Sequence, residues 1–222
     1  MSLTVAVPRG SLFAETLDLL DRLGMETAEV RSNDRKLLFD RPDGGSLITM
    51  RPSDVPTYVE AGAADLGVTG KDVLMEQAER DVYELVDLAY GRCRMVLAGA
   101  AGEVRAAEAL RRLGVMRVAT KYPRIAARYF ERTGRQAEIV EVKGSVELAP
   151  LTGLVEAIVD LTATGATLAH NGLVEREEIA VCTARLIANP VAHKLKAAEV
   201  DAVLARVRTG RRALGVGRWE SS

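Results

Sequence analysis

The chain has 222 residues, 48% of them apolar, which is enough to bury the core of one large domain or of two small lobes. Thirty basic residues against 31 acidic ones leave a formal charge of -1, so no global field draws the protein to nucleic acid or to an anionic membrane. The first residues lack a signal-peptide pattern, and no stretch approaches the roughly 20 apolar residues of a membrane span. We therefore expect a soluble, cytoplasmic protein in which any phosphate recognition is local.

Patterns typical of nucleophilic or metal chemistry are missing. Cys93 and Cys182 lie in apolar, strand-like stretches without CxxC spacing, which favours buried, reduced thiols over a disulfide or a zinc site. His170 and His193 are far apart with no acidic partner pattern, so we expect them at the surface or at helix ends. Neither covalent catalysis nor a dedicated protein metal site is expected.

Alternating strands and helices are predicted along the whole chain. An apolar run from Leu3 to Val7 ends at Pro8-Arg9-Gly10, and apolar residues at helical spacing follow it up to Gly24. Residues 37–50 carry two apolar runs around Pro-Asp-Gly-Gly, which predicts a β-hairpin. The later elements are expected as helix 55–62, strand 66–69, a helix from 71, strands 82–88 and 94–99, helix 104–113, strand 181–188 and helix 193–208. This alternation favours an α/β fold with mainly parallel strands.

The two halves of the sequence echo each other. The opening VAVPRGSLFAETLDLLDRLG is answered by VATKYPRIAARYFERTG at 118–134, and residues 59–70 are answered by 154–165, with Asp65 aligned to Asp160 as an acid that opens a short strand. Two matches in the same order favour two similar lobes with a ligand cleft between them, although generic βα units also match by chance. We expect lobe I at 1–90 plus 172–222 and lobe II at 91–171, joined by a double crossover.

A loop rich in threonine and glycine follows the apolar strand that ends at Asp160. Such a loop suits a phosphate, because glycine lets the backbone curl closely while N–H groups and threonine hydroxyls point inward. Asp160 would then face the ribose hydroxyls or a hydrated magnesium ion. The lysine of a Walker A loop is absent, and Thr and Gly also cap ordinary helices, so the loop alone leaves phosphate binding and helix capping both open.

Several cations fall in loops by sequence position. Arg9 follows the first strand, Arg35 lies in a basic stretch, and Arg51 follows the hairpin. Arginine forks suit pyrophosphate oxygens, and parallel α/β folds present ligands at the carboxyl ends of their strands. Taken singly, each arginine is better explained as a solvated surface charge, and Glu147 as a capping acid at a helix start.

Seven segments have the order and spacing of one family: 5–10, 34–37, 51–59, 64–72, 117–123, 144–150 and 160–171. Together they resemble the ATP phosphoribosyltransferases of histidine biosynthesis across nearly the whole chain. The resemblance implies a two-lobed α/β fold like that of the type II periplasmic binding proteins, with the active site in the cleft between the lobes.

The resemblance also implies roles for individual residues. Those expected to bind phosphoribosyl pyrophosphate are Glu147, Asp160, Thr162, Ala163, Thr164, Gly165, Ala166 and Thr167. Those expected to bind ATP are Arg9, Gly10, Ser11 and Asp72, and the catalytic cations are Arg9, Arg35 and Arg51. The loop departs from the family pattern at Ala166, where arginine is frequent, and at Ala169-His170, where Arg-Glu is common.

The reaction that the resemblance implies is a direct displacement. N1 of the adenine of ATP attacks the anomeric carbon, pyrophosphate leaves with Mg²⁺, and the configuration inverts, so alignment of two anionic substrates and cationic stabilisation of the leaving group supply catalysis. Mg²⁺ is expected with the substrates only. The length resembles the short form of the family, so we expect a homodimer within a hetero-octamer that includes a regulatory subunit similar to histidyl-tRNA synthetase.

Two alternatives stay open. The same two-lobed fold serves non-enzymatic proteins that bind or sense small ligands, although the missing secretion signal and the missing helix-turn-helix count against them. Phosphoribosyltransferases of the common type usually place two adjacent acids before a Thr-rich loop, whereas Val159 precedes Asp160 here.

Overall fold

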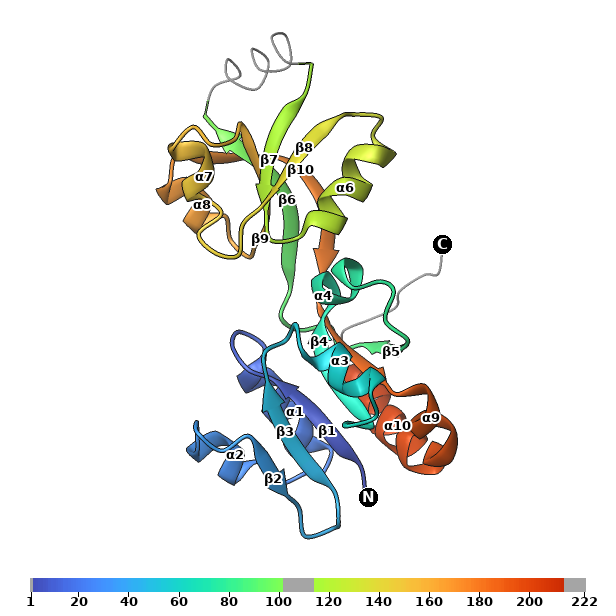
Figure 1. Cartoon of the computed structure of the whole chain (residues 1–222). Helices are drawn as coiled ribbons and strands as arrows, with labels where there is room; N and C mark the ends of the chain where they lie inside the picture. Colours follow the sequence, from blue (N-terminus) through green and yellow to red (C-terminus); the bar gives the residue numbers. More distant parts are fainter. Residues whose placement is uncertain (1, 102–113, 214–222) are drawn as a thin grey trace. The chain divides into compact units, whose positions relative to one another are not determined.

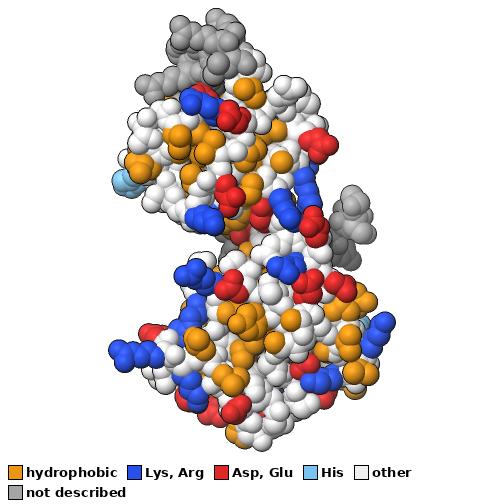
Figure 2. All heavy atoms as spheres, viewed as in Figure 1, with side chains coloured by type: hydrophobic (Ala, Val, Ile, Leu, Met, Phe, Trp, Pro, Cys, Tyr) orange, Lys and Arg blue, Asp and Glu red, His pale blue; other side chains and the backbone are white. Residues whose placement is uncertain are grey.

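The structure is a computed structural model that describes residues 2–101 and 114–213, with side chains as far as Thr209. The chain forms two compact units, unit 1 at residues 1–91 and 183–222 and unit 2 at residues 92–182, and it passes between them twice. The expected helix at 104–113 lies outside the described residues. None of the described helices is long and apolar enough to cross a membrane. On the face shown in Figure 2, basic and acidic side chains are interspersed on both units.

Unit 1 is a mixed sheet covered by helices on both faces (Figure 1). Its elements are β1 (Thr4–Pro8), α1 (Phe13–Arg22), α2 (Ala28–Ser32), β2 (Leu38–Asp40), β3 (Ser46–Met50), α3 (Val55–Glu60), β4 (Leu66–Gly70), α4 (Lys71–Glu76), β5 (Tyr83–Asp87), β11 (Ala184–Ala188), α9 (Pro190–Leu195) and α10 (Ala197–Ala213). The strand order is β2-β3-β1-β4-β11-β5. The predicted hairpin is confirmed, because β2 pairs antiparallel with β3.

Side-chain alternation on β1 explains how the helices cover this sheet. Val5 and Val7 belong to the buried cluster that includes residues of α1 and α10, whereas Ala6 between them packs with Val55 and Val59 of α3. Successive residues of a strand point to opposite faces, so one short strand supplies both layers of the core.

Unit 2 has the same architecture on a smaller scale. Its described elements are β6 (Cys93–Ala100), β7 (Met116–Thr120), α6 (Pro123–Arg132), β8 (Ala137–Glu141), α7 (Leu148–Leu151), β9 (Ala157–Thr162), α8 (Ala166–His170) and β10 (Leu173–Cys182). The strand order is β10-β6-β9-β7-β8. Figure 1 shows α6 on one side of this sheet and α7 and α8 on the other.

Five strands of unit 1 correspond to the five described strands of unit 2, in keeping with the two similar lobes that the internal echo predicts, and β2 has no counterpart. The order β3-β1-β4-β11-β5 in unit 1 matches β8-β7-β9-β6-β10 in unit 2. The expectation of mainly parallel pairing is wrong, because β11 and β6 pair antiparallel with both of their neighbours. Each is the strand with which the chain enters a unit from the other one, so the double crossover itself inverts one strand in each sheet.

The alignment of Asp65 with Asp160 is also wrong. In register, Val5 of β1 pairs with Leu66, and Val118 of β7 pairs with Ala157. The counterpart of Asp65 is therefore Glu156, which likewise opens its strand.

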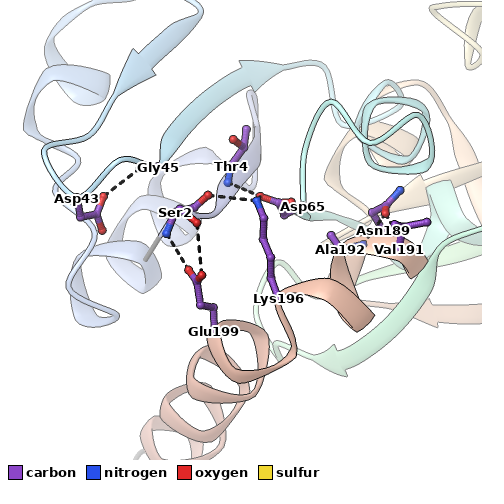
Figure 3. Close-up of polar contacts among 10 residues, drawn as sticks. All are labelled: Ser2, Thr4, Asp43, Gly45, Asp65, Asn189, Val191, Ala192, Lys196 and Glu199. Atoms are coloured by element: carbon purple, nitrogen blue, oxygen red, sulfur yellow. Dashed lines mark hydrogen bonds and ion pairs between the residues drawn. The ribbon is translucent and has the colours of Figure 1, made fainter.

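Asp65 and Glu156 also make the same contact, because each carboxylate accepts a hydrogen bond from a backbone N–H of the neighbouring strand. The Thr4 N–H donates to Asp65 Oδ2 at 2.8 Å, and the Arg117 N–H donates to Glu156 Oε2 at 2.8 Å. Figure 3 shows the Asp65 carboxylate between Thr4 and Lys196. These acids stabilise the fold, whereas Asp160 lies near the opposite end of its strand.

Unit 2 extends to residue 182, whereas lobe II was expected to end at 171. The reason is β10, which pairs along its length with β6. Four charged residues, Glu175 to Glu178, and two irregularities in register hide this strand from the period-2 pattern. Cys182 lies opposite Cys93 at the end of this ladder, and both are thiols; Cys182 is buried as expected, whereas Cys93 is only half-buried.

Candidate active site

The carboxyl ends of three parallel strands meet at one edge of the unit 1 sheet. Pro8 of β1 is the register partner of Met50 of β3, and the Arg9 N–H donates to the Met50 carbonyl at 2.7 Å. Arg9 and Arg51 therefore follow neighbouring strands, and Asp72 lies in the first turn of α4 after the third strand. The fold brings together these predicted site residues of unit 1 at the edge where open α/β sheets bind ligands.

Arg9 is held by contacts to several elements. Its Nε donates to Thr49 Oγ1 at 3.1 Å, and its guanidinium donates to the Lys36 carbonyl at 3.2 Å and lies 3.4 Å from Asp34. The guanidinium also lies over the Phe13 ring, 5.4 Å from its centroid. These contacts draw the loop that carries the exposed Arg35 towards the end of β1.

Arg51 differs from Arg9, since its side chain is exposed while its loop is held firmly. Thr69 Oγ1 donates to the Pro52 carbonyl at 2.9 Å, and Gln77 Nε2 donates to the Ser53 carbonyl at 2.8 Å. The backbone is thus fixed while the guanidinium faces solvent, an arrangement that suits a cation awaiting an anionic ligand.

Glycines shape both ends of this edge. Gly10 has a φ of +89°, a conformation that side chains other than glycine rarely adopt, and it turns the chain from β1 towards α1 with the exposed Ser11 next to it. At the end of β4, the Asp72 carboxylate occupies the place where a Cβ of Gly70 would stand. A side chain at either position would alter the path of the loop.

In unit 2, Asp160 lies near the carboxyl end of β9 and is 6% exposed. Burial raises the pKa of Asp160 and nearby Glu147 raises it further, while Lys121 and the Leu161 N–H act in the opposite direction. The Lys121 Nζ lies 3.3 Å from Asp160 Oδ1. The buried Thr120 hydroxyl donates to the Val159 carbonyl at 2.6 Å and so fixes the strand end that presents Lys121.

Within the loop from Thr162 to Thr167, backbone N–H groups donate to threonine hydroxyls, as they do at helix caps. The Gly165 N–H donates to Thr162 Oγ1 at 2.8 Å, and the Ala166 N–H donates to Thr164 Oγ1 at 3.3 Å. Gly165 has a φ of +79°, which makes glycine the fitting residue there. Thr162 is buried, whereas the predicted residues Ala163, Thr164, Ala166 and Thr167 are exposed.

The remaining residues of unit 2 considered in the sequence lie near Asp160 or at the surface. Glu147 stands, half-buried, at the N-cap position of α7, but its side chain makes no capping hydrogen bond; instead, it raises the pKa of Asp160. His170 is exposed at the end of α8, as expected, with its Nδ1 2.7 Å from the Ala166 carbonyl. Among the described residues, no three His, Cys, Asp or Glu side chains are grouped as metal ligands.

Sequence reasoning did not assign Lys121 to the site. The signal was available in the internal echo, because VATKYP spans the carboxyl end of β7 as VAVPRG spans the carboxyl end of β1. Corresponding loops therefore carry Arg9 in unit 1 and Lys121 in unit 2.

Comparison with solved structures defines the class of fold. The VFT2 domain of Bordetella pertussis BvgS is similar over 92% of this chain and 85% of that chain, with a TM-score of 0.58 at 15% identity. At that identity the likeness concerns the fold alone, which is the two-lobed α/β fold of the type II periplasmic-binding-protein kind that the sequence predicts.

Closer comparisons define the family. The sequence model described as "ATP phosphoribosyltransferase" matches residues 51–209. The ATP phosphoribosyltransferase of Rubrobacter xylanophilus is 54% identical over 94% of this chain and 97% of its own length. A structure of the ATP phosphoribosyl transferase (HisG:HisZ) complex from Thermotoga maritima aligns with a TM-score of 0.79 at 35% identity, over 93% of this chain and 97% of that chain. The chain belongs to the ATP phosphoribosyltransferase family.

Proposed function

We propose that this chain joins ATP to phosphoribosyl pyrophosphate to give N1-(5-phosphoribosyl)-ATP and pyrophosphate, the first step of histidine biosynthesis. The observation that carries the proposal is the 54% identity to an ATP phosphoribosyltransferase over nearly the full length of both chains. The polar groups at the strand ends of both units agree with it, since each unit offers cations near a glycine turn.

Unit 2 would hold the ribose 5-phosphate part of phosphoribosyl pyrophosphate. Thr162, Thr164 and Gly165 place hydroxyl and N–H groups in one tight loop, and the Asp160 carboxylate at the end of β9 is positioned to accept hydrogen bonds from ribose hydroxyls. Glu147 would approach the same ribose. Lys121 would keep Asp160 charged in its buried position, because an opposite charge 3.3 Å away favours the carboxylate.

Unit 1 would supply the positive charge for ATP and for the leaving pyrophosphate. Arg9 and Arg51 follow adjacent strands, and Arg35 lies in the loop that Arg9 contacts. Adenine N1 is itself a nucleophile, so the protein has to align the two substrates and stabilise charge on the departing oxygen. Gly10, Ser11 and Asp72 line the same edge and would contact ATP.

Magnesium would arrive with the phosphates of the substrates. Glu147 is close enough to raise the pKa of Asp160, but the described residues offer no third ligand beside these two acids. Two carboxylates suit a Mg²⁺ ion that keeps most of its waters and its substrate oxygens, rather than a closed protein cage. The ion would neutralise charge on pyrophosphate as that group leaves.

We also propose a cytoplasmic homodimer that assembles with a regulatory subunit resembling histidyl-tRNA synthetase, in a hetero-octamer. The support is the Thermotoga maritima protein, which is named as part of a HisG:HisZ complex and of which this chain covers 97%. Light scattering on the purified chain should give the mass of a homodimer. With a candidate regulatory subunit from the same genome, it should give the mass of a hetero-octamer. A monomeric chain that binds no such subunit would contradict the proposal.

The activity is tested by mixing the purified chain with ATP, phosphoribosyl pyrophosphate and Mg²⁺ while inorganic pyrophosphatase removes one product. We expect a rise in near-ultraviolet absorbance and a product with the mass of phosphoribosyl-ATP, both absent when either substrate is left out. A chain that binds a ligand without forming product, with and without the regulatory subunit, would favour the ligand-binding alternative.

A further inference from the structure

Arg94 and Glu175 form a two-pronged ion pair beside the Thr/Gly loop of unit 2. The Arg94 guanidinium donates to both carboxylate oxygens of Glu175, at 2.5 and 2.8 Å, and it lies 3.8 Å from Glu178. The side chains of Arg94 and Glu175 are 25% and 30% exposed. A fork of this geometry is also the one that suits two oxygens of a phosphate.

The register of the sheet places Arg94 on the same face as the candidate site. Arg94 of β6 is the partner of Thr162 of β9, and Val96 is the partner of Asp160. Partners across a ladder point to the same face, as do residues two apart along a strand. Arg94, Asp160 and Thr162 therefore share one face at one end of the sheet.

Glu175 reaches the loop itself. Its Oε1 lies 2.9 Å from the position that a Cβ on Gly165 would occupy. The Arg94 guanidinium that binds this oxygen is thus one side chain away from the turn that opens α8. A carboxylate held there occupies space over the backbone that a phosphate would approach.

The next acid along β10 shows that this placement is specific. Between Glu175 and Glu177 the register shifts, so Glu177 turns to the other face, where it pairs with Arg135 at 2.6 Å and accepts from the Tyr129 hydroxyl. β10 therefore contributes the acid to two Arg–Glu pairs, one beside the loop and one on the other face of the sheet.

The loop needs a cation that its own residues do not supply. All six side chains from Thr162 to Thr167 are uncharged, and the Gly165 and Ala166 N–H groups already donate to threonine hydroxyls. A phosphate monoester carries a charge of about -1.5 to -2 at neutral pH. Lys121 is paired with Asp160, the acid expected to face the ribose, whereas Arg94 is paired with Glu175, the acid that lies against Gly165 of the loop.

We propose that Arg94 binds the 5-phosphate of phosphoribosyl pyrophosphate and that Glu175 is an internal anion that competes with this phosphate for the guanidinium. The proposal rests on the function proposed above and adds a residue to it. Binding exchanges the carboxylate partner of Arg94 for a phosphate, and Glu175 moves away from Gly165. Glu175 thus weakens substrate binding while it keeps Arg94 in position.

Substitutions of the two partners should act in opposite directions. Arg94→Gln should raise KM for phosphoribosyl pyrophosphate roughly ten- to hundredfold, as expected for the loss of charge-assisted hydrogen bonds, with KM for ATP unchanged. Glu175→Gln removes the competing charge and should lower the same KM by roughly two- to tenfold. Arg135→Gln and Glu177→Gln break the matched pair on the other face and should leave both KM values unchanged.

Titration of the full chain with ribose 5-phosphate, followed by calorimetry, separates this proposal from the proposed function. This probe carries the phosphate without pyrophosphate, so Arg94→Gln should weaken its binding and Glu175→Gln should strengthen it even if the wild-type chain forms no product. If Arg94→Gln does not fold, Arg94→Lys keeps the charge without the fork and should weaken binding less. Both substitutions shifting affinity in the same direction, or neither shifting it, would make the pair a structural clamp and overturn the proposal.

Discussion

Lys121 Nζ lies 3.3 Å from the Oδ1 of Asp160, a carboxylate that is 6% exposed. The ion pair does not fully offset burial, because the pKa of Asp160 stays raised above its ordinary value. Burial of the charged Asp160 side chain therefore lowers the stability of the fold, which is typical of a group that is kept for its function.

The raised pKa gives a prediction with a definite sign. An acid that binds its proton more readily in the folded state favours folding below its unfolded pKa of about 3.9, and this contribution is lost as the pH rises through the folded pKa. Asp160→Asn removes the buried charge, so the variant should be more stable than wild type at pH 7.5, and the difference should shrink as the pH is lowered towards 4.5.

The same variant should lose activity. Removal of a carboxylate that accepts hydrogen bonds from the ribose should lower kcat/KM for phosphoribosyl pyrophosphate by roughly ten- to hundredfold. Urea unfolding at both pH values and steady-state kinetics measure the two effects. A variant that is less stable than wild type at pH 7.5 would mean that Lys121 outweighs burial.

Arg51 and Arg9 should respond differently to truncation. Arg51→Ala should lower kcat more than it raises KM for ATP, with stability within about 0.5 kcal/mol of wild type, because the exposed guanidinium can act on the leaving group without supporting the fold. Arg9→Ala should also cost about 1–2 kcal/mol of unfolding free energy, since it removes bonds to Thr49 and the Lys36 carbonyl. Unchanged kcat in Arg51→Ala would remove Arg51 from the catalytic groups.

Local patterns predicted the elements whose apolar period is clear. The run from Leu3 to Val7, the glycine turn and the helix spacing up to Gly24 correspond to β1, the Arg9 loop and α1. The internal echo went further, because it indicated two similar α/β lobes, although it did not indicate the antiparallel strand in each sheet.

Sequence reasoning failed where contacts between distant residues determine the structure. The period-2 pattern of β10 is interrupted by four consecutive charges. The partner of Glu175, Arg94, lies 81 residues away, and the partner of Glu177, Arg135, lies 42 residues away. No local rule connects such residues, so neither the end of unit 2 nor the position of Arg94 beside the loop could be predicted. Arg9 and Arg51 of unit 1 were easier to predict as site residues, since each directly follows a recognisable strand.

Gly67 is a packing residue within a segment that resembles the family. A Cβ at this position would stand 2.6 Å from Val55 Cγ1 and 2.8 Å from Val59 Cγ2, and both valines are fully buried. Gly67→Ala should therefore destabilise unit 1 by about 1–3 kcal/mol through overpacking against α3, with little change in kcat while the protein is folded. Gly144→Ala, which meets nothing within 4 Å, is the matched control for urea unfolding.

Asp65 and Asp160 should give opposite results, although the sequence aligns them. Asp65 Oδ2 accepts from the Thr4 N–H and from Lys196 Nζ, each at 2.8 Å, so Asp65→Ala leaves two donors without their acceptor (Figure 3). We expect a loss of about 1–3 kcal/mol in unfolding free energy with kcat/KM unchanged. Glu199→Ala, which removes two exposed hydrogen bonds from Ser2, should cost at most about 1 kcal/mol. If Asp65→Ala impaired turnover while leaving stability intact, this acid would belong to the chemistry, and the structural pairing of Asp65 with Glu156 would be misleading.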